Sequence, residues 1–391
     1  MTRVAFTVFP GEGWTGGTNY IRNLTSALAE LPNRPVEAVL FVPPGTSANS
    51  LAEITPHLAQ PPVVVPGWAT DSASRRRRLW HSAVLQNDRV SLAAFEQQRI
   101  DVVFVHPAWY GLRFPLPTVA WIADFQHCHL PQMFSRGNRL RRTLGYAALS
   151  RCASTVMLSS EDARRDCERY YPKSRGKTAV LPFAVRLDPQ VMATDAAAVA
   201  RRHGLPDRFF YMPNQLWKHK NHLNVLEAMR LLRERGSNVV LAASGNPNDS
   251  RNPAHPKQVL ALAEAYGLAD SFRFLGLIPY ADLMPLMRAS QAVVNASLFE
   301  GWSTPVEEAK ALGVPLLLSD LAVHREQTQA GEAVYFDPHS PAAIADALQS
   351  AWSRPAEERV AAESAAVQRY HVSRLRFAAG FATLVSALNR G

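Results

Sequence analysis

Short apolar runs recur along the whole chain, and stretches with helical periodicity separate several of them. Apolar runs of this length, rich in Val, Ile, Leu and Phe, are typical of strands that a parallel sheet buries on both faces. In the first half they cover residues 3–10, 36–42, 63–65, 102–105, 118–122, 155–158 and 178–181. A helix is expected between the first two runs, from about residue 19 to residue 30.

The second half repeats this alternation. Its predicted strands are residues 209–212, 238–243, 272–275, 292–295, 315–318 and 334–336, and its predicted helices include residues 223–233, 258–266 and 281–288. Strands that alternate with helices in both halves predict an α/β protein with two parallel, doubly wound sheets. Ligands of such sheets bind at the carboxyl ends of the strands, so each half is expected to present its binding loops there.

The length of 391 residues exceeds what a single core usually supports, which favours two domains. We place an N-terminal Rossmann-like domain at residues 1–185 and a C-terminal one at residues 186–372. The Ala- and Asp-rich stretch at residues 194–200 is the candidate linker. A final amphipathic helix is expected over about residues 373–391.

The most informative stretch follows the apolar run at residues 292–295. After a loop, Thr304 is expected to cap a helix, Pro305 occupies a position where its missing N–H costs nothing, and Glu307 completes a capping box. The start of a helix carries unpaired N–H groups and partial positive charge, so it favours an anion. Two carboxylates flank this start, Glu300 and Glu308.

Seven residues separate Glu300 from Glu308 within Phe-Glu-Gly-Trp-Ser-Thr-Pro-Val-Glu-Glu-Ala-Lys-Ala-Leu-Gly, so the two are eight positions apart. This string resembles the donor-binding motif of the family-4 retaining glycosyltransferases, which have the two-domain GT-B fold. The resemblance implies that Glu300 faces the hydroxyls of the donor sugar and Glu308 the ribose of the nucleotide. It also implies that backbone N–H groups of Trp302, Ser303 and Thr304 approach the diphosphate, and that Gly301 is among the donor-binding residues. The alternative is a capped surface helix whose acids complement the helix dipole.

The first loop is rich in glycine. Gly11, Gly13 and Gly16 match the spacing of a dinucleotide-binding fingerprint, but the next strand ends without the expected acidic residue, so we reject NAD. Gly16 and Gly17 instead resemble the glycine pair that family-4 enzymes place near the donor diphosphate. A turn made easier by glycine is the alternative.

The loop after the strand at residues 209–212 contains Lys218 and Lys220. An ammonium group there can stabilise a departing diphosphate. By resemblance, Lys220 matches a family lysine, whereas Gln215 occupies the position of a family arginine. We therefore expect Lys218 to supply the second positive charge. The alternative is a pair of solvated lysines.

The strand at residues 118–122 leads into a dense polar segment. By resemblance, a His-Asp pair is expected at this strand end, but this chain has Ala123 and Asp124, with His127 three residues later. We expect His127, or else Asp124, to orient the acceptor, with Cys128 and His129 as packing residues. Such clustering without spaced ligands does not favour a metal site. We expect neither a metal nor another cofactor.

The formal net charge is +9, and arginines concentrate in the first half. They form a run, Arg75 to Arg78, and a segment from Arg136 to Arg151 in which leucines are interleaved. A basic face with apolar neighbours fits an anionic membrane surface, and a solvated helix fits equally well. Nucleic acid is not expected, because the basic segments lack the stacking aromatics of known modules.

Hydrophobic residues make up 47% of the chain and charged residues 19%, as in soluble globular proteins. No apolar run is long enough to span a membrane, and residues 1–10 predict a strand rather than a signal peptide. The three cysteines suggest neither a disulfide framework nor a zinc site. These features favour the cytoplasm, with peripheral contact to the inner face of the plasma membrane.

Together, these features predict a retaining glycosyltransferase of bacterial polysaccharide biosynthesis. It would move a mannose-, glucose- or rhamnose-type sugar from a nucleotide diphosphate to a glycan or a lipid-linked saccharide. A GT-B sugar-nucleotide epimerase and a non-catalytic GT-B binding protein remain as alternatives.

Overall fold

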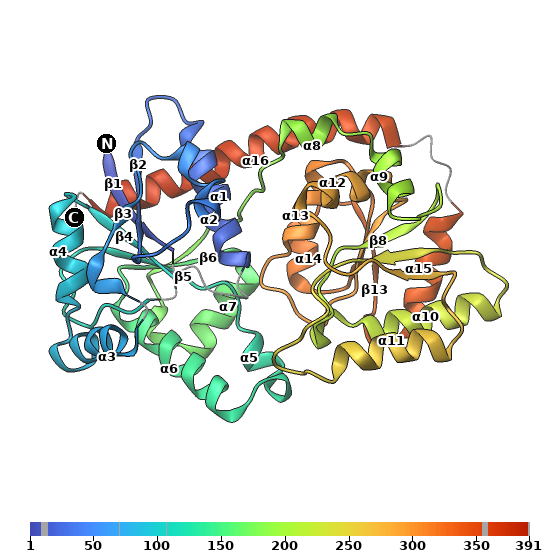
Figure 1. The fold of residues 1–391 in the computed structure, drawn as a ribbon, viewed down its shortest axis with the longest axis horizontal. Helices are drawn as coiled ribbons and strands as arrows, with labels where there is room; N and C mark the ends of the chain where they lie inside the picture. Colours follow the sequence, from blue (N-terminus) through green and yellow to red (C-terminus); the bar gives the residue numbers. More distant parts are fainter. Residues whose placement is uncertain (9–14, 70, 107, 354–358, 390–391) are drawn as a thin grey trace. The chain divides into compact units, whose positions relative to one another are not determined.

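The computed structural model describes residues 1–391 except 9–14, 70, 107, 354–358 and 390–391 (Figure 1). By its internal contacts, the chain divides into two compact units. The first comprises Met1–Phe125, Leu140–Arg186 and Val372–Gly391, and the second comprises Gln126–Arg139 and Leu187–His371. Gln126–Arg139 therefore groups with the second unit, although the expected domain boundary placed it in the first.

The first unit contains a parallel sheet in the order β3-β2-β1-β4-β5-β6-β7. Its strands are β1 (Thr2–Thr7), β2 (Val36–Val42), β3 (Val63–Val64), β4 (Val102–Val105), β5 (Thr118–Trp121), β6 (Thr155–Leu158) and β7 (Thr178–Val180). The α-helices of this half of the chain are α1 (Thr15–Ala29), α2 (Ala48–Leu51), α3 (Ser72–Trp80), α4 (Arg89–Gln97), α5 (Gln126–His129), α6 (Arg136–Cys152) and α7 (Glu161–Tyr170).

The second unit contains a parallel sheet in the order β10-β9-β8-β11-β12-β13. Its strands are β8 (Phe210–Met212), β9 (Leu241–Ala243), β10 (Phe272–Phe274), β11 (Val293–Asn295), β12 (Leu316–Ser319) and β13 (Ala333–Phe336). Its helices are α8 (Pro189–Ala193), α9 (Ala196–Arg202), α10 (His222–Glu234), α11 (His255–Ala265), α12 (Tyr280–Ala289), α13 (Thr304–Ala311), α14 (Ala322–Gln327) and α15 (Pro341–Trp352).

Both faces of the second sheet are buried, as the continuous apolar runs predicted. Along β8, Phe210 and Met212 belong to one hydrophobic core, together with residues of α10 and α15. Tyr211 belongs to a second core on the opposite face, together with residues of α12 and α13. Figure 1 shows α10 and α11 on one side of this sheet and α12 and α13 on the other.

The last helix, α16 (Arg359–Leu388), begins before the predicted start near residue 373. Its C-terminal part packs on the first unit, where the ring centroid of Phe381 lies 5.9 Å from that of Phe6. Arg374 is fully buried there and hydrogen-bonds to Glu30 and to the carbonyl of Val185. Within the described residues, no helix is both long and apolar enough to cross a bilayer.

Two local predictions were wrong. The expected linker at residues 194–200 is largely helical, because the side chain of Asp195 accepts hydrogen bonds from the N–H groups of Ala197 and Ala198 and so caps α9. At α13, the N-cap is Ser303 rather than Thr304, and its side chain makes no capping hydrogen bond. Gly11 and Gly13 of the glycine-rich loop lie outside the described residues.

Candidate active site

The order in which the chain adds strands to the second sheet reverses between β8 and β11. From β8 the chain adds β9 and β10 on one side, and it then crosses over to place β11 on the other side of β8. The loops that leave the carboxyl ends of these two adjacent strands separate at this point, and open α/β sheets bind their ligands in the resulting crevice. The predicted donor loops are these two, one containing Lys220 and the other containing Glu300.

An ion pair joins the two loops. Nζ of Lys220 lies 2.6 Å from Oε1 of Glu300, and their side chains are only 13% and 10% exposed. Burial alone would raise the pKa of Glu300, but the charge and hydrogen bond of Lys220 hold it below the usual value. Glu300 is therefore ionised at neutral pH. The two residues are 80 positions apart in the sequence, so only the fold brings them together.

Two residues that the sequence analysis did not consider orient Glu300. Ser297 donates a 2.7 Å hydrogen bond to the same Oε1 atom, and Nδ2 of Asn295 lies 3.4 Å from it. Asn295 is the last residue of β11 and is fully buried. It also donates to the hydroxyl of Ser303 at 2.7 Å, and so links the carboxylate to the start of α13.

Gln327, at the end of α14, fixes the start of α13 from the other side. Its amide nitrogen donates to the carbonyl of Ser303 at 2.8 Å, and its amide oxygen accepts from the N–H of Ser303 at 3.2 Å. The amide nitrogen also donates to Glu307 at 3.0 Å, so Glu307 is engaged here rather than in a capping box. This arrangement orients the first turn of α13, where unpaired N–H groups favour an anion.

The other residues predicted at the start of α13 differ in how far they are exposed to solvent. Gly301 and Ser303 are buried, whereas Trp302 and Thr304 are partly exposed. Glu308 is buried in the second turn of α13. Burial raises the pKa of the Tyr211 phenol on β8, and the charge of Glu308 raises it further. Glu308 thus lies near β8, the strand that leads into the loop with Lys220, while its contact with ribose stays a prediction.

The loop of Gln215 and Lys218 packs tightly on the loop that follows β9. Gly245 has a φ of +149°, and a Cβ there would lie 2.7 Å from Cα of Gln215, so the close approach requires glycine. The N–H of Lys218 donates to the buried carboxylate of Asp249 at 3.2 Å. The Lys218 side chain is exposed, whereas that of Lys220 is mostly buried.

A further cation lies beside these lysines. The guanidinium carbon of Arg251 is 5.1 Å from the centre of the Trp217 ring, and Nη2 is 3.5 Å from Nδ1 of His219. Arg251 also donates a 2.8 Å hydrogen bond to Gln126. It lies after β9 at the same edge of the sheet, a position at which its charge could have been noticed from the sequence.

In the first unit, the glycine pair was expected in the loop before a helix that starts near residue 19, but the helix starts earlier and includes the pair. Gly16 and Gly17 fall in the first turn of α1, which follows β1. The N–H groups of a first turn have no partner within the helix, so bare backbone there can donate to an anion. The approach of a diphosphate to this turn stays a prediction.

The predicted acceptor residues differ in burial and in the groups that they contact. Asp124 pairs with Arg142, with 3.2 Å between the two side chains. His127 is 1% exposed and packs near Phe134, because α5 turns its side chain inward. His129, expected to be a packing residue, is exposed and stacks on Phe299, with 5.0 Å between the rings. A role for His127 in orienting the acceptor stays a prediction that would require its side chain to move.

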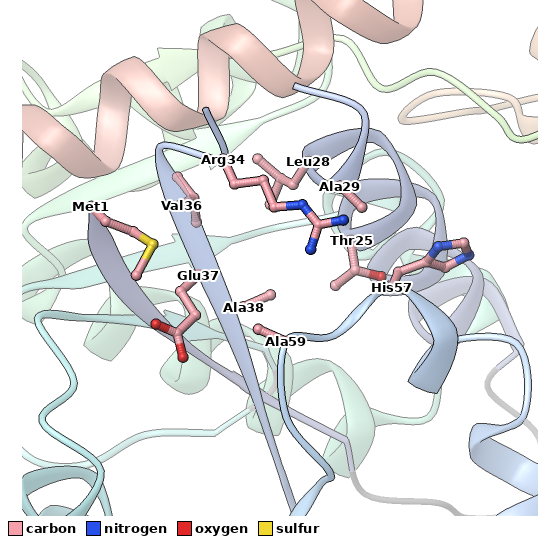
Figure 2. A pocket seen from close by; sticks show the side chains of 10 residues that line it. All are labelled: Met1, Thr25, Leu28, Ala29, Arg34, Val36, Glu37, Ala38, His57 and Ala59. Carbon is pink, nitrogen blue, oxygen red and sulfur yellow. The ribbon is translucent and has the colours of Figure 1, made fainter. Parts of the chain in front are cut away.

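Among the described residues, no group of three or more His, Cys, Asp or Glu side chains could hold a metal ion. A pocket of about 190 Å³ lies in the first unit, lined by Arg34, His57 and the start of β2 (Figure 2). It lies at the amino ends of β1 and β2, opposite the edge that carries the glycine pair. It is therefore separate from the candidate site.

Solved structures share this fold over almost the whole chain. Sucrose-phosphate synthase from Thermosynechococcus elongatus matches with a TM-score of 0.71 at 17% identity, covering 99% of this chain and all of that one. HepE of Anabaena, in complex with UDP and glucose, matches with a TM-score of 0.68 at 16% identity and the same coverage. The protein therefore has the GT-B fold, with two Rossmann-like sheets, as predicted.

The family match concerns the second half of the chain. Residues 197–369 match the family model described as Glycosyl transferases group 1. The D-inositol 3-phosphate glycosyltransferase of Streptomyces avermitilis is 28% identical over 222 residues, which cover 55% of this chain and 48% of that protein. The enzyme of the same name from Streptomyces scabiei is 27% identical over 214 residues. The chain thus spans about half the length of the curated relatives it matches.

Proposed function

We propose that this protein is a retaining glycosyltransferase that uses a nucleotide-diphosphate sugar. The observation that carries the proposal is the buried Lys220–Glu300 pair at the switch point of the second sheet, next to the start of α13. A cation, a carboxylate and a helix N-terminus are the groups that a diphosphate and a polyhydroxylated sugar require together. The match of residues 197–369 to group 1 glycosyl transferases supports it.

We assign each of these residues a role in donor binding or catalysis from the charge of its side chain. Glu300 accepts hydrogen bonds from hydroxyls of the donor sugar, and Glu308 from those of the ribose. Lys220 and the N–H groups at the start of α13 stabilise the negative charge that grows on the departing diphosphate. The N–H groups of Gly16 and Gly17 add to this stabilisation.

Retention of configuration follows from a front-face displacement. The bond from the anomeric carbon to the diphosphate breaks, and the acceptor oxygen bonds to that carbon on the same face. The proton of the acceptor hydroxyl passes to the departing diphosphate oxygen. Neither Glu300, which holds Lys220 at 2.6 Å, nor the buried Glu308 is then required as a nucleophile. No metal ion takes part in this scheme.

The acceptor in this proposal is a glycan or a lipid-linked saccharide of polysaccharide biosynthesis. Support comes from α6, where Leu140 and Leu144 are 60% and 61% exposed and lie one turn apart. Arg136, Arg139 and Arg141 are exposed on the same helix. Exposed apolar side chains among arginines suit the headgroup region of an anionic membrane, so we propose peripheral contact with the cytoplasmic face.

The test has two stages. Thermal unfolding is first measured with UDP, GDP, ADP and dTDP, and we begin with UDP because HepE was solved with it. The nucleotide that stabilises the protein then identifies the sugar nucleotides to be tried with saccharide acceptors. Release of the nucleoside diphosphate that requires acceptor supports transfer. An epimerase would convert the donor without acceptor, and a binding protein would be stabilised without turnover.

A further inference from the structure

A single ammonium group serves two anions in the proposed reaction. Lys220 neutralises the buried carboxylate of Glu300 at 2.6 Å, and it also stabilises the charge of the diphosphate. A buried carboxylate that loses its cation is strongly destabilised unless another positive charge takes its place. A second partner for Glu300 would therefore allow Lys220 to turn towards the donor.

A buried histidine lies beside this ion pair. His324 is on α14, the same helix as Gln327, and its side chain is completely buried. It is near enough to Glu300 and Lys220 for their charges to change its pKa. All three residues belong to the second unit, so the arrangement depends on the fold of that unit alone.

The imidazole of His324 is held in one orientation. Its Nδ1 lies 2.8 Å from the carbonyl oxygen of Ser319, the last residue of β12, and since a carbonyl only accepts, Nδ1 carries the proton. In the neutral ring Nε2 is then the acceptor, and this buried atom makes no hydrogen bond. Burial of an unpaired polar atom is unfavourable, so Nε2 would gain from a partner.

Opposing charges act on the ring. Burial lowers the pKa of His324 below its ordinary value and Lys220 lowers it further, whereas Glu300 and the hydrogen bond to Ser319 raise it. Among the described residues, Glu300 in the loop after β11 and Lys220 in the loop after β8 are the charged groups that act on it. With Lys220 paired to Glu300, the ring is neutral at pH 7. Once the ammonium turns away, the carboxylate favours protonation of the ring.

We propose that His324 replaces Lys220 as the partner of Glu300 when the sugar nucleotide binds. The ammonium of Lys220 turns to the diphosphate, Nε2 of His324 takes up one proton from the solvent, and the imidazolium pairs with the carboxylate. The proton returns to the solvent when the diphosphate leaves. This inference rests on the proposed function, and it makes His324 a positioning residue, because it acts through Glu300 and Lys220 without touching the donor.

Proton uptake makes donor affinity depend on pH. The pKa of His324 is lower with Lys220 on Glu300 and higher with Lys220 on the diphosphate, so binding takes up a proton at pH values between the two. Over that range the affinity for the donor falls as the pH rises, by at most about tenfold per pH unit. Below the lower pKa and above the higher one, His324 makes no contribution to the pH dependence.

Calorimetric titration with a sugar nucleotide measures the uptake directly. Both phosphates of this ligand are diesters, so the ligand itself does not titrate near neutral pH. Titrations in buffers that differ in heat of ionisation count the protons bound. Between about pH 5.5 and 8.5, we expect the wild type to take up as much as about one proton per donor and its Kd to rise with pH.

Two substitutions at His324 separate the proton from the hydrogen bonds. In His324→Asn the amide can keep the bond to the carbonyl of Ser319 but places nothing at the Nε2 position, so uptake should disappear and Kd should no longer depend on pH. His324→Gln can place an N–H near that position, so it should bind the donor more tightly than His324→Asn, again without uptake. His371→Asn, at an exposed position of the same unit, is the matched control and should behave as the wild type.

Glu300→Gln provides a second route to the same answer if the His324 variants do not fold, which thermal unfolding shows. It removes the charge that attracts the proton, so uptake should disappear although His324 is present. Persistent uptake in this variant would overturn the inference.

Absence of proton uptake by the wild type over the whole pH range would overturn the inference. Unchanged uptake in a folded His324→Asn protein would overturn it as well, because the proton would then bind another group. Both results leave the glycosyltransferase function intact. A wild-type protein that takes up the proton but transfers sugar to no saccharide would overturn the proposed function alone, and one that binds no sugar nucleotide would overturn both.

Discussion

Two carboxylate–cation pairs lie at the carboxyl ends of the two sheets, and they differ in almost every physical respect. Lys220 and Glu300 are 2.6 Å apart, mostly buried, and surrounded by further donors to the carboxylate. Asp124 and Arg142 are 3.2 Å apart, and each side chain is 31% exposed. The first pair therefore acts in a medium of low effective dielectric constant, and the second acts close to water.

The buried pair is preorganised, whereas the exposed pair can adapt to a ligand. A buried pair has already lost its water, so it can stabilise developing charge without reorganising during the reaction. An exposed pair contributes little to stability and can exchange its partner for a ligand at small cost. Under the proposed function, the buried pair would serve a constant group such as a diphosphate sugar, and the exposed pair a more variable acceptor.

Removing Lys220 should have the largest effect. Lys220→Ala leaves the buried carboxylate of Glu300 without its cation, so we expect kcat to fall about 1,000-fold. Because one partner of a buried pair is lost, we also expect the free energy of unfolding to fall by about 3 kcal/mol. Steady-state kinetics and denaturant unfolding measure the two effects.

Lys218→Ala is the matched control, because Lys218 lies two residues away in the same loop and its side chain is exposed. It should change kcat by less than about threefold if its charge is solvated. Equal, small effects of the two substitutions would show that the departing diphosphate is stabilised elsewhere, with Arg251 as the nearby cation to test next.

The architecture could be predicted from the sequence because each buried strand is itself a short apolar run of consecutive residues. The strands of both sheets lie where these runs were found. The errors at α9 and α13 concern helix ends, where competing partners decide the outcome. At residues 194–200, Asp195 turned an expected linker into a helix start, and at α13 the hydroxyl of Ser303 bonds to Asn295 instead of capping.

The site could be predicted only in part, because several of its contacts join distant positions. Glu300 was identified from its motif, but the roles of Asn295 and Gln327 depend on how β11 and α14 pack against the start of α13.

The ribose assignment predicts the next largest effect. Glu308→Ala should weaken nucleoside diphosphate binding by about 2–3 kcal/mol, or about 30- to 150-fold, because a charge-assisted pair of hydrogen bonds is lost. Calorimetric titration of the wild type and the variant measures it. A 2′-deoxynucleotide should show a smaller difference between the two proteins, and unchanged affinity for the ribonucleotide would exclude this role for Glu308.

A smaller effect is expected at Gln327, which touches no substrate in this scheme. Gln327→Leu removes three hydrogen bonds around Ser303 and Glu307, and it should raise the donor KM about tenfold through a less ordered α13 start. Gln258→Leu, at an exposed position on α11, is the matched control and should leave KM unchanged. If Gln327→Leu lowered kcat and left the donor KM unchanged, a positioning role in donor binding would be excluded.

The smallest effect on stability is expected for the exposed pair. Asp124→Asn should lower the free energy of unfolding by less than about 1 kcal/mol, because the interaction with Arg142 is screened by water. If Asp124 also contacts the acceptor, the variant should raise the acceptor KM several-fold while the donor KM stays constant.

Arg142→Gln and the double variant complete a double-mutant cycle that separates the contributions of Asp124 and Arg142. A double variant no worse than Asp124→Asn would mean that Arg142 acts only through Asp124. A stability loss as large as that of Lys220→Ala would show that the two pairs are energetically alike and would remove the contrast between the sheets.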